Sequence, residues 1–348
     1  MTMDLMALDE NFIPTGQTRL LYFDLSWHRK YYETGQFQVQ ILAADYLPSM
    51  KYIYTNERPE LGMIQKIEYT DDDRMVVLSG FFFEKVLSDK IIYPMFEQYG
   101  TRAKYVYSAV QKYRADIPKL VMGFYEDAGE KIQKQDTGTD LETMSYETLK
   151  VDEKSYRISY DYETDRAVFE IYQGKDRTQD QMENNFVTFS KGFRNIRGVK
   201  ATLDSSNYKN YFVVGGSGEG ADRIYEIVDL SGGEYQRQLF IDAKNENFNS
   251  EEQTIEDYRA GLRQKAVEKA LDYVSISNVE FDAAANVGAK YLEDYDLGDK
   301  CDIIIDAILA SYQARIIEVL ETWNQGVHKV TLVFGDKIPT QYEKARLR

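Results

Sequence analysis

The chain has 348 residues, enough for two or three hydrophobic cores, and its hydrophobic fraction of 43% excludes a chain that is disordered throughout. A formal net charge of −16 disfavours general binding to nucleic-acid backbones, so no sequence-specific nucleic acid is expected as a partner. The single cysteine, Cys301, excludes an intramolecular disulfide and a multi-cysteine zinc site, and the 28 tyrosines favour a β-rich protein.

The first residues, MTMDLMALDENF, are acidic and lack the charged-then-apolar pattern of a signal peptide. No segment approaches the roughly 18 apolar residues of a membrane span. We therefore expect a soluble protein that is made in the cytoplasm and has no membrane partner.

Residues 1–100 predict strands. In the segment QFQVQILA, Phe37, Val39 and Ile41 alternate with polar residues, which is the period of a half-buried strand. Two apolar runs flank residues 71–73, three aspartates that we interpret as a hairpin turn. A calcium loop is disfavoured there, because the alternating ligand spacing and the terminal glutamate are missing.

Helical patterns follow in the next fifty residues. The segment 103–118 has apolar residues at helical spacing until a proline stops the pattern. This stripe consists of Val106, Val110, Tyr113 and Ile117. The polar span 126–140 predicts a loop or mobile linker, and residues 140–151 predict a short helix that Thr139 or Asp140 caps.

From Tyr156 onwards, short strands recur at hairpin spacing, the first turn lying near Thr164 and Asp165. After a helix, residues 274–335 return to strands separated by turns. These turns are expected at 297–299, 309–311 and 324–326.

The strongest helix is predicted over residues 250–273. Ser250 and Gln253 fit a capping box, with acidic residues in the first turn. Its inner stripe, which we interpret as core, consists of Ile255, Tyr258, Leu262, Ala266 and Ala270. No alternation of strand, helix and strand indicates a parallel sheet, so the predicted fold class is α+β and β-rich.

Histidine is nearly absent, and neither His28 nor His328 has a neighbour in a catalytic spacing. Cys301 lies in the strand-like run KCDIII, where a buried thiol is more common than a nucleophile. The HExxH, GxSxG and GxxxxGK[ST] motifs do not occur. We therefore assign no catalytic, cofactor-binding or metal-binding residue and expect a protein that is not an enzyme.

Acidic residues crowd together in YLEDYDLGD. They are Glu293, Asp294, Asp296 and Asp299. Two of these carboxylates could serve a glycan hydrolase, and a hard cation near the three aspartates stays open. A chain with 58 acidic residues produces such clusters by chance, so we favour a solvated cluster.

The segment YFVVGGSGEGADRIYEIV satisfies G-x-G-x-x-A from Gly216. A dinucleotide fingerprint requires that the glycines open a helix. The following residues instead alternate as a strand, and Glu219 and Asp222 would put negative charge beside the phosphates. We interpret Gly216 and Gly218 as part of a hairpin tip with a role at a subunit contact.

The order of these segments resembles the tail hub, or baseplate hub, proteins of long-tailed bacteriophages, especially the siphophage tail-tip hub family, over nearly the whole chain. The similar motifs are TGQFQVQI, GMIQKIEY…MVVLSGFFFEKVLSDKII, YQGKDRTQDQMENNFVTFSKGFRNI and YLEDYDLGDKCDIII. Their matching positions are Gly62, Gly80, Lys90, Ile91, Ile92, Gly174, Asp176, Arg177, Thr178, Asn185, Phe189, Ser190, Asn195 and Ile196, with Arg223 just beyond the glycine-rich hairpin.

The resemblance implies a pair of related small β-barrels with inserted α+β domains. It divides the chain into an N-terminal barrel domain (1–98), an inserted α+β domain (99–190), a second barrel and hairpin region (191–274) and C-terminal strands that close the barrel (275–348).

The resemblance also implies a structural virion protein, a homotrimeric hub at the distal end of the tail tube that forms part of the DNA exit channel. Its partners would be the distal tail protein, tail-tube proteins, the tape-measure protein, and tip fibres or receptor-binding proteins. Larger relatives continue into fibres or peptidoglycan hydrolases, and we expect none on this chain.

Two alternatives remain open. A carbohydrate-binding adhesin at the tail tip would use exposed aromatic rings, for which Trp27 and Trp323 are the candidates. A carboxylate-based glycan hydrolase would use a pair such as Asp294 and Asp299.

Overall fold

The computed structural model describes most of the chain. The described residues are 3–15, 19–71, 74–246, 248, 254–273, 276–284, 287–308, 310–324 and 326–335.

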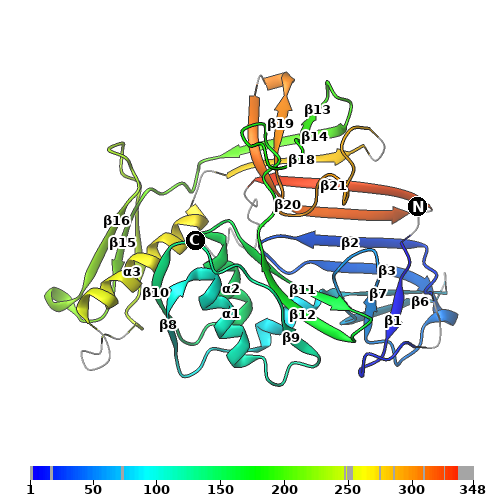
Figure 1. Ribbon diagram of the computed structural model, residues 1–348, viewed down its shortest axis with the longest axis horizontal. Helices are drawn as coiled ribbons and strands as arrows, with labels where there is room; N and C mark the ends of the chain where they lie inside the picture. The colour runs from blue at the N-terminus through cyan, green and yellow to red at the C-terminus, as the bar shows by residue number, and fades with distance from the viewer. Residues whose placement is uncertain are drawn as a thin grey trace.

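One ten-stranded sheet contains strands from both ends of the chain (Figure 1). Along it the order is β14-β18-β21-β20-β2-β3-β7-β6, and β19 pairs with both β20 and β13. Its strands are β2 (Asp24–Lys30), β3 (Gln36–Leu42), β6 (Lys66–Thr70), β7 (Met75–Phe81), β13 (Thr188–Ser190), β14 (Ile196–Asp204), β18 (Ile276–Ala283), β19 (Lys300–Ile305), β20 (Ala310–Asn324) and β21 (Val327–Gly335).

The pairing of β2 with β20 holds the two halves of this sheet together. It runs antiparallel from Lys30 opposite Glu318 to Asp24 opposite Asn324, and the earlier part of β20 pairs with β19 instead. A separate hydrophobic core lies on each side of this junction, one under β2, β3 and β7 and the other under β18 to β21. The predicted alternation of Phe37, Val39 and Ile41 is confirmed, because all three are buried.

A third core contains the helices and short sheets that lie between these two halves in the sequence. They are β8 (Phe96–Thr101), α1 (Arg102–Tyr113), β9 (Leu120–Met122), β10 (Lys131–Asp136), α2 (Leu141–Lys150), β11 (Ser155–Asp161) and β12 (Arg166–Tyr172). Asp140 caps α2 as predicted, through its side chain and the Thr143 amide. The prediction of one helix from 103 to 118 is too long, since α1 ends at Tyr113 and Ile117 is buried outside it.

The prediction of a loop over residues 126–140 is wrong, because β10 pairs antiparallel with β8 there. The physical reason is a buried ion pair. Lys134 points inward from β10, and its Nζ atom lies 2.8 Å from Glu268 on α3. A lysine at an inward position makes a strand look polar in the sequence.

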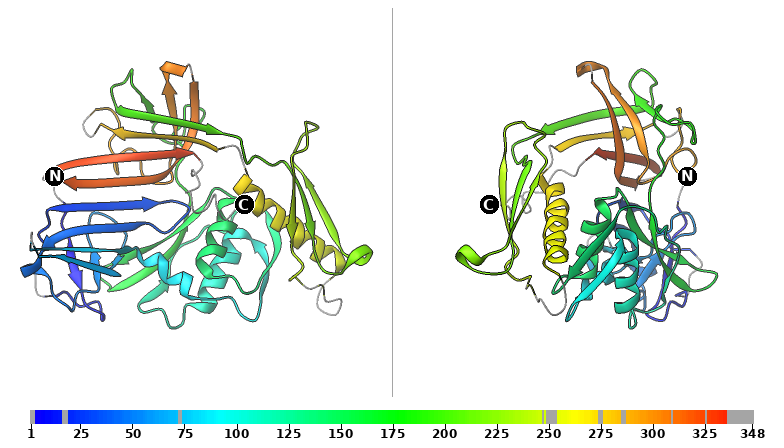
Figure 2. Two further views of the ribbon diagram at one scale, coloured as in Figure 1. Left: turned by 180° about the vertical axis from the view of Figure 1, so that it is seen from behind. Right: turned by 60° about the vertical axis from the view of Figure 1, so that its left-hand side comes forward.

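A fourth core belongs to a three-stranded sheet covered by a long helix. Its elements are β15 (Tyr211–Gly215), β16 (Tyr225–Asp229), β17 (Gln238–Asp242) and α3 (Ile255–Ala270). In the right-hand view of Figure 2, α3 lies between this sheet and the rest of the molecule. We call these four elements the hairpin unit.

The predicted start of α3 at Ser250 is wrong. Thr254 is the N-cap, and it forms the capping box with Asp257. Ser250 and Gln253 lie outside the described residues. The inner stripe is confirmed from Tyr258 to Ala270, whereas Ile255 is exposed.

The remaining elements are short. They are β1 (Met6–Leu8), β4 (Tyr52–Tyr54), β5 (Gly62–Met63) and the 3-10 helices η1 (Ala43–Asp45), η2 (Phe83–Asp89), η3 (Gly220–Asp222), η4 (Leu271–Tyr273) and η5 (Asp306–Ile308). The sequence predicts a turn at 309–311, but Ala310 and Ser311 already belong to β20 and pair with β19. The chain instead turns just before them, at η5. No helix of the described residues is long and apolar enough to cross a membrane.

The α+β, β-rich fold class is confirmed. Parallel pairing occurs only locally among the described strands, between β9 and β12, β13 and β19, and β15 and β17. Among the described pairings none closes a ring, so the closed form of the two small barrels stays a prediction, as does the division into four domains.

Candidate functional site: a buried charged seam

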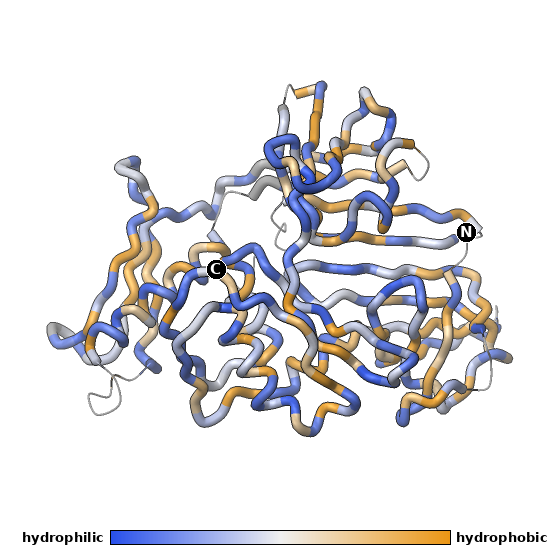
Figure 3. Tube along the Cα trace, viewed as in Figure 1, coloured by the Kyte–Doolittle hydropathy of each residue, from blue (hydrophilic) through white to orange (hydrophobic). Residues whose placement is uncertain are grey.

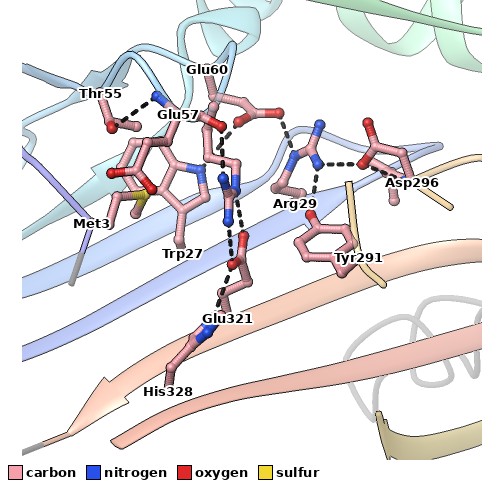
Figure 4. A network of polar contacts seen from close by, with 12 residues as sticks. Met3, Trp27, Arg29, Thr55, Glu57, Glu60, Tyr291, Asp296, Glu321 and His328 are labelled. Carbon is pink, nitrogen blue, oxygen red and sulfur yellow. Dashed lines mark hydrogen bonds and ion pairs between the residues drawn. The ribbon is translucent and has the colours of Figure 1, made fainter. Parts of the chain in front are cut away.

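Buried charges fill the junction between β2 and β20. Arg58 donates from Nε and Nη2 to the two carboxylate oxygens of Glu321, both at 2.6 Å. The side chain of Glu321 is 0% exposed and that of Arg58 only 6%. Nε2 of His328, on β21, lies 3.1 Å from the same carboxylate (Figure 4). Glu321 thus binds a loop of the N-terminal region to two C-terminal strands.

A second set of contacts lies beside the first (Figure 4). Arg29, on β2, donates to Glu60 at 2.6 Å, to Tyr291 at 2.7 Å and to Asp296 at 2.6 Å. Glu60 also accepts the indole N–H of Trp27 at 3.1 Å. We call this network, together with Arg58 and Glu321, the charged seam.

The electrostatics of the seam favour the ionised form of Glu321. Burial alone would raise the pKa of the Glu321 carboxyl, but hydrogen bonds from Arg58 and His328 outweigh it and lower the pKa below its usual value. A bidentate arginine–carboxylate pair also fixes the relative orientation of its two partners. The seam therefore positions the two ends of the chain.

Two of the motifs that carry the family resemblance meet next to the seam. Asp299, in DLGD, accepts Nε of Arg177 at 2.5 Å and the backbone N–H of Lys175 at 2.7 Å, both from GKDRT. A Cβ atom on Gly174 would lie 1.9 Å from the carbonyl oxygen of Gly298. The motifs are thus complementary parts of one contact.

The structure separates the acidic cluster of the sequence. Asp296 and Asp299 each bind an arginine, Asp294 accepts the backbone N–H of Lys290 at 2.8 Å, and Glu293 pairs with the Lys290 side chain at 3.1 Å. In the parts of the chain that the structure describes, no group of three His, Cys, Asp or Glu side chains is placed to hold a metal ion. Asp299 is only 4% exposed, so it does not form an open carboxylate pair with Asp294.

The other candidate side chains are structural. His28 lies 2.7 Å from Glu318 on the neighbouring strand. Burial raises the pKa of the Cys301 thiol, which is fully buried and therefore a weak nucleophile. Trp27 is 0% exposed and Trp323 is 4% exposed, so neither tryptophan presents a sugar-binding surface.

The interpretation of the glycine-rich segment as a hairpin tip is confirmed. Strands β15 and β16 are antiparallel neighbours, ending with Gly215 opposite Tyr225. Arg223 closes the tip by donating to the carbonyl oxygens of Gly215 at 2.7 Å and Gly216 at 3.0 Å. The Ser217 amide donates to the Tyr258 hydroxyl at 2.7 Å, which joins the tip to α3.

The hairpin unit has an apolar surface on the side away from α3. Ile227 and Phe240 are each 52% exposed and Tyr225 is 47% exposed. Val213 lies between Ile227 and Phe240 in the strand register. Hydrophobic residues recur along these strands in Figure 3. We call these four residues the outer face.

Sequence reasoning missed both the seam and the outer face. The seam had one local signal: Glu321 occupies an inward position between Val319 and Trp323 in an alternating strand. The outer face also had a local signal. Tyr225 and Ile227 are large apolar residues at the positions of β16 that alternate with its more buried residues.

This architecture is that of bacteriophage tail proteins. A tail protein from Neisseria meningitidis MC58 matches with a TM-score of 0.61 and 12% identity, covering 97% of both chains. The 43 kDa tail protein of prophage MuSo2 from Shewanella oneidensis matches with a TM-score of 0.59 and 12% identity, covering 95% of this chain and 98% of that one. A prophage tail protein from Listeria monocytogenes EGD-e gives 0.58 and 12%, covering 99% and 98%.

Residues 8–336 match the family described as Siphovirus ReqiPepy6 Gp37-like protein, and the chain belongs to this family. The predicted relationship to siphophage tail proteins is therefore confirmed. The chain is thus a member of a siphovirus protein family and has the fold of phage tail proteins. A search of curated proteins finds no match.

Proposed function

We propose that the protein is a homotrimeric hub at the distal end of the tail tube, where it joins the tube and the distal tail protein to the tip or baseplate and forms part of the DNA exit channel. Family membership and a tail-protein fold over the full chain support a structural role in the virion. The tail-tip position, the tape-measure contact and a place in host attachment and genome ejection belong to this proposal.

The outer face carries the assembly part of the proposal. Each copy has a formal net charge of −16, so two copies repel one another over most of their surfaces. Ile227 offers an uncharged contact beside the rings of Tyr225 and Phe240, over which the Arg223 guanidinium lies. The outer edges of β16 and β17 are unpaired among the described strands. A second copy of the chain is the occupant that we assign to this face.

Light scattering tests the trimer directly. Three chains of 40.4 kDa give roughly 120 kDa, the mass expected by multi-angle light scattering at high protein concentration. Ile227→Asp places a charge in the centre of the outer face and is expected to shift the mass to that of one chain. Met182→Asp is the matched control. Met182 is 97% exposed and lies in the loop between β12 and β13, outside the hairpin unit. A monomeric wild type, or equal masses for both variants, would contradict the proposal.

Neither alternative gains support from the site. The adhesin's candidate residues, Trp27 and Trp323, are buried. The hydrolase's candidate pair is separated, because Asp299 is bound to Arg177. Expected results are therefore no binding on a glycan array and no turnover of glycan substrates.

A further inference from the structure

A small cavity lies where the N-terminal region meets the inserted helices. Its volume is about 20 Å³, and its walls come from β2, η2, α2, β11, β12 and the turn at Leu297. This space is enough for one water molecule. The cavity shares Arg29 and Glu60 with the charged seam.

Glu84, on η2, lines this cavity with an incompletely satisfied carboxyl group. The residue is 5% exposed, and one oxygen accepts the backbone N–H of Ile158 on β11 at 3.0 Å. The other oxygen, Oε2, has no hydrogen-bond partner among the described residues. Buried polar atoms of this kind normally bind a partner, and a water in the cavity would supply one.

The charged groups around the cavity do not neutralise Glu84. Those lining it are Arg29, Lys30, Glu33, Glu60 and Arg157, together with the tyrosines Tyr146, Tyr156 and Tyr172. Arg29 is bound to Glu60 and Asp296, Lys30 to Glu33, and Arg157 to Glu170. Each cation thus has an acid of its own.

Burial raises the pKa of the Glu84 carboxyl to about 7. The Ile158 amide opposes this shift, and the charge of Glu60 adds to it. An ionised Glu84 would place an uncompensated charge in the cavity, which is costly at a buried position.

We propose that Glu84 and one ordered water form a proton-binding site at this junction, so that folding of the N-terminal region against the inserted region takes up a proton. The neutral carboxyl group donates to the water and still accepts the Ile158 N–H. Ionisation leaves a bare charge in the buried cavity and lowers the stability of the folded chain.

The direction of the pH effect follows from linkage. The folded form keeps the proton up to about pH 7, whereas the unfolded chain releases it near 4.5. The folded state therefore binds more protons between these values, and Glu84 makes the protein less stable as the pH rises through that window.

The substitution Glu84→Gln removes the titration and keeps an oxygen for Ile158. We expect the ratio of the wild-type to the variant unfolding constant to rise by roughly two orders of magnitude between pH 4.5 and pH 8, as measured by urea unfolding. Glu33→Gln is the matched control: it changes the same charge at the same cavity, but Glu33 pairs with Lys30 and its side chain is 36% exposed. Its curve should run parallel to that of the wild type.

Infrared spectroscopy of the wild type tests the same proposal even if Glu84→Gln does not fold. We expect the carbonyl band of a protonated carboxyl group that disappears with a midpoint near pH 7. Parallel pH profiles for wild type and Glu84→Gln, or no band with this midpoint, would overturn the proposal. The infrared band does not depend on the oligomeric state, so this measurement is independent of the trimer test.

Discussion

The charged seam and the hairpin unit distribute polar and apolar groups in opposite ways. The seam buries Arg29, Arg58 and Glu321 with almost no solvent contact. The hairpin unit instead leaves Ile227 and Phe240 half exposed on a three-stranded sheet. One region places charges inside, and the other places hydrophobic side chains outside.

This difference indicates two kinds of contact. A buried ion pair adds little net stability, but it penalises every arrangement in which one partner is left alone. The seam therefore suits a contact within one chain that must form in a single geometry. An exposed apolar face is stabilised when any complementary surface covers it, which suits a contact made during assembly.

The largest effect is expected when half of the main ion pair is removed. Glu321→Leu leaves the Arg58 guanidinium and the His328 ring without their shared carboxylate in a buried site. The expected loss is about 3–5 kcal/mol of unfolding free energy, measured by urea denaturation.

The double variant Arg58→Met with Glu321→Leu sharpens this test. Replacing both charges by apolar side chains of similar size removes the unpaired guanidinium, so it should recover most of the loss, and a double-mutant cycle would report the coupling. A double variant that is no more stable than Glu321→Leu would show that the unpaired Arg58 guanidinium does not cause the loss of stability.

A smaller effect is expected at the tip of the hairpin unit. Gly218 has a φ of +99°, and a Cβ atom on it would lie 2.5 Å from the Asp222 carbonyl oxygen. A Cβ atom on Gly216 would lie 2.5 Å from the Tyr258 hydroxyl. Gly216→Ala and Gly218→Ala should each destabilise the tip by roughly 1–3 kcal/mol, or impair assembly. Hydrogen exchange of the amides of β15 and β16 measures the stability of the tip, and light scattering measures assembly.

Gly261→Ala is the control within the hairpin unit, because Gly261 lies in α3 without a positive φ and no atom lies within 4 Å of the position that its Cβ would take. Mononucleotides and dinucleotides should leave the melting temperature of the wild type unchanged. Equal exchange rates in all three variants, or a nucleotide-dependent rise in melting temperature, would contradict the role of these glycines as a structural tip.

The sequence predicted the parts of this fold that depend on neighbouring residues. The alternation in β3, the Asp140 cap and the glycine-rich hairpin follow from short-range periodicity and turn chemistry, and all three are confirmed. The seam depends on partners that are distant in the chain: Arg58 and Glu321 are 263 residues apart. No local pattern specifies which of 58 acidic residues a buried arginine will bind.

The error at β10 has the same origin. Lys134 is buried because Glu268, 134 residues later, lies opposite it on α3. The prediction of the start of α3 is wrong for a different reason, because two adjacent segments both fit a capping pattern. Ser250 precedes Gln253, and Thr254 precedes Asp257, and only tertiary packing decides between them.

The smallest expected effect concerns that choice of cap, and it tests how far the hairpin unit depends on its own helix. The Thr254 hydroxyl accepts the Asp257 amide at 3.1 Å and donates to the Asp257 carboxylate at 2.6 Å. Thr254→Ala should cost about 1 kcal/mol, seen as faster hydrogen exchange in the first turns of α3, whereas Thr254→Ser should keep the wild-type rates. Because α3 also contacts β10 through Glu268 and Lys134, exchange should remain slow near the C-terminal end of the helix. Uniformly faster exchange along α3 would mean that the cap, and not the packing against β10, holds the hairpin unit to the rest of the molecule.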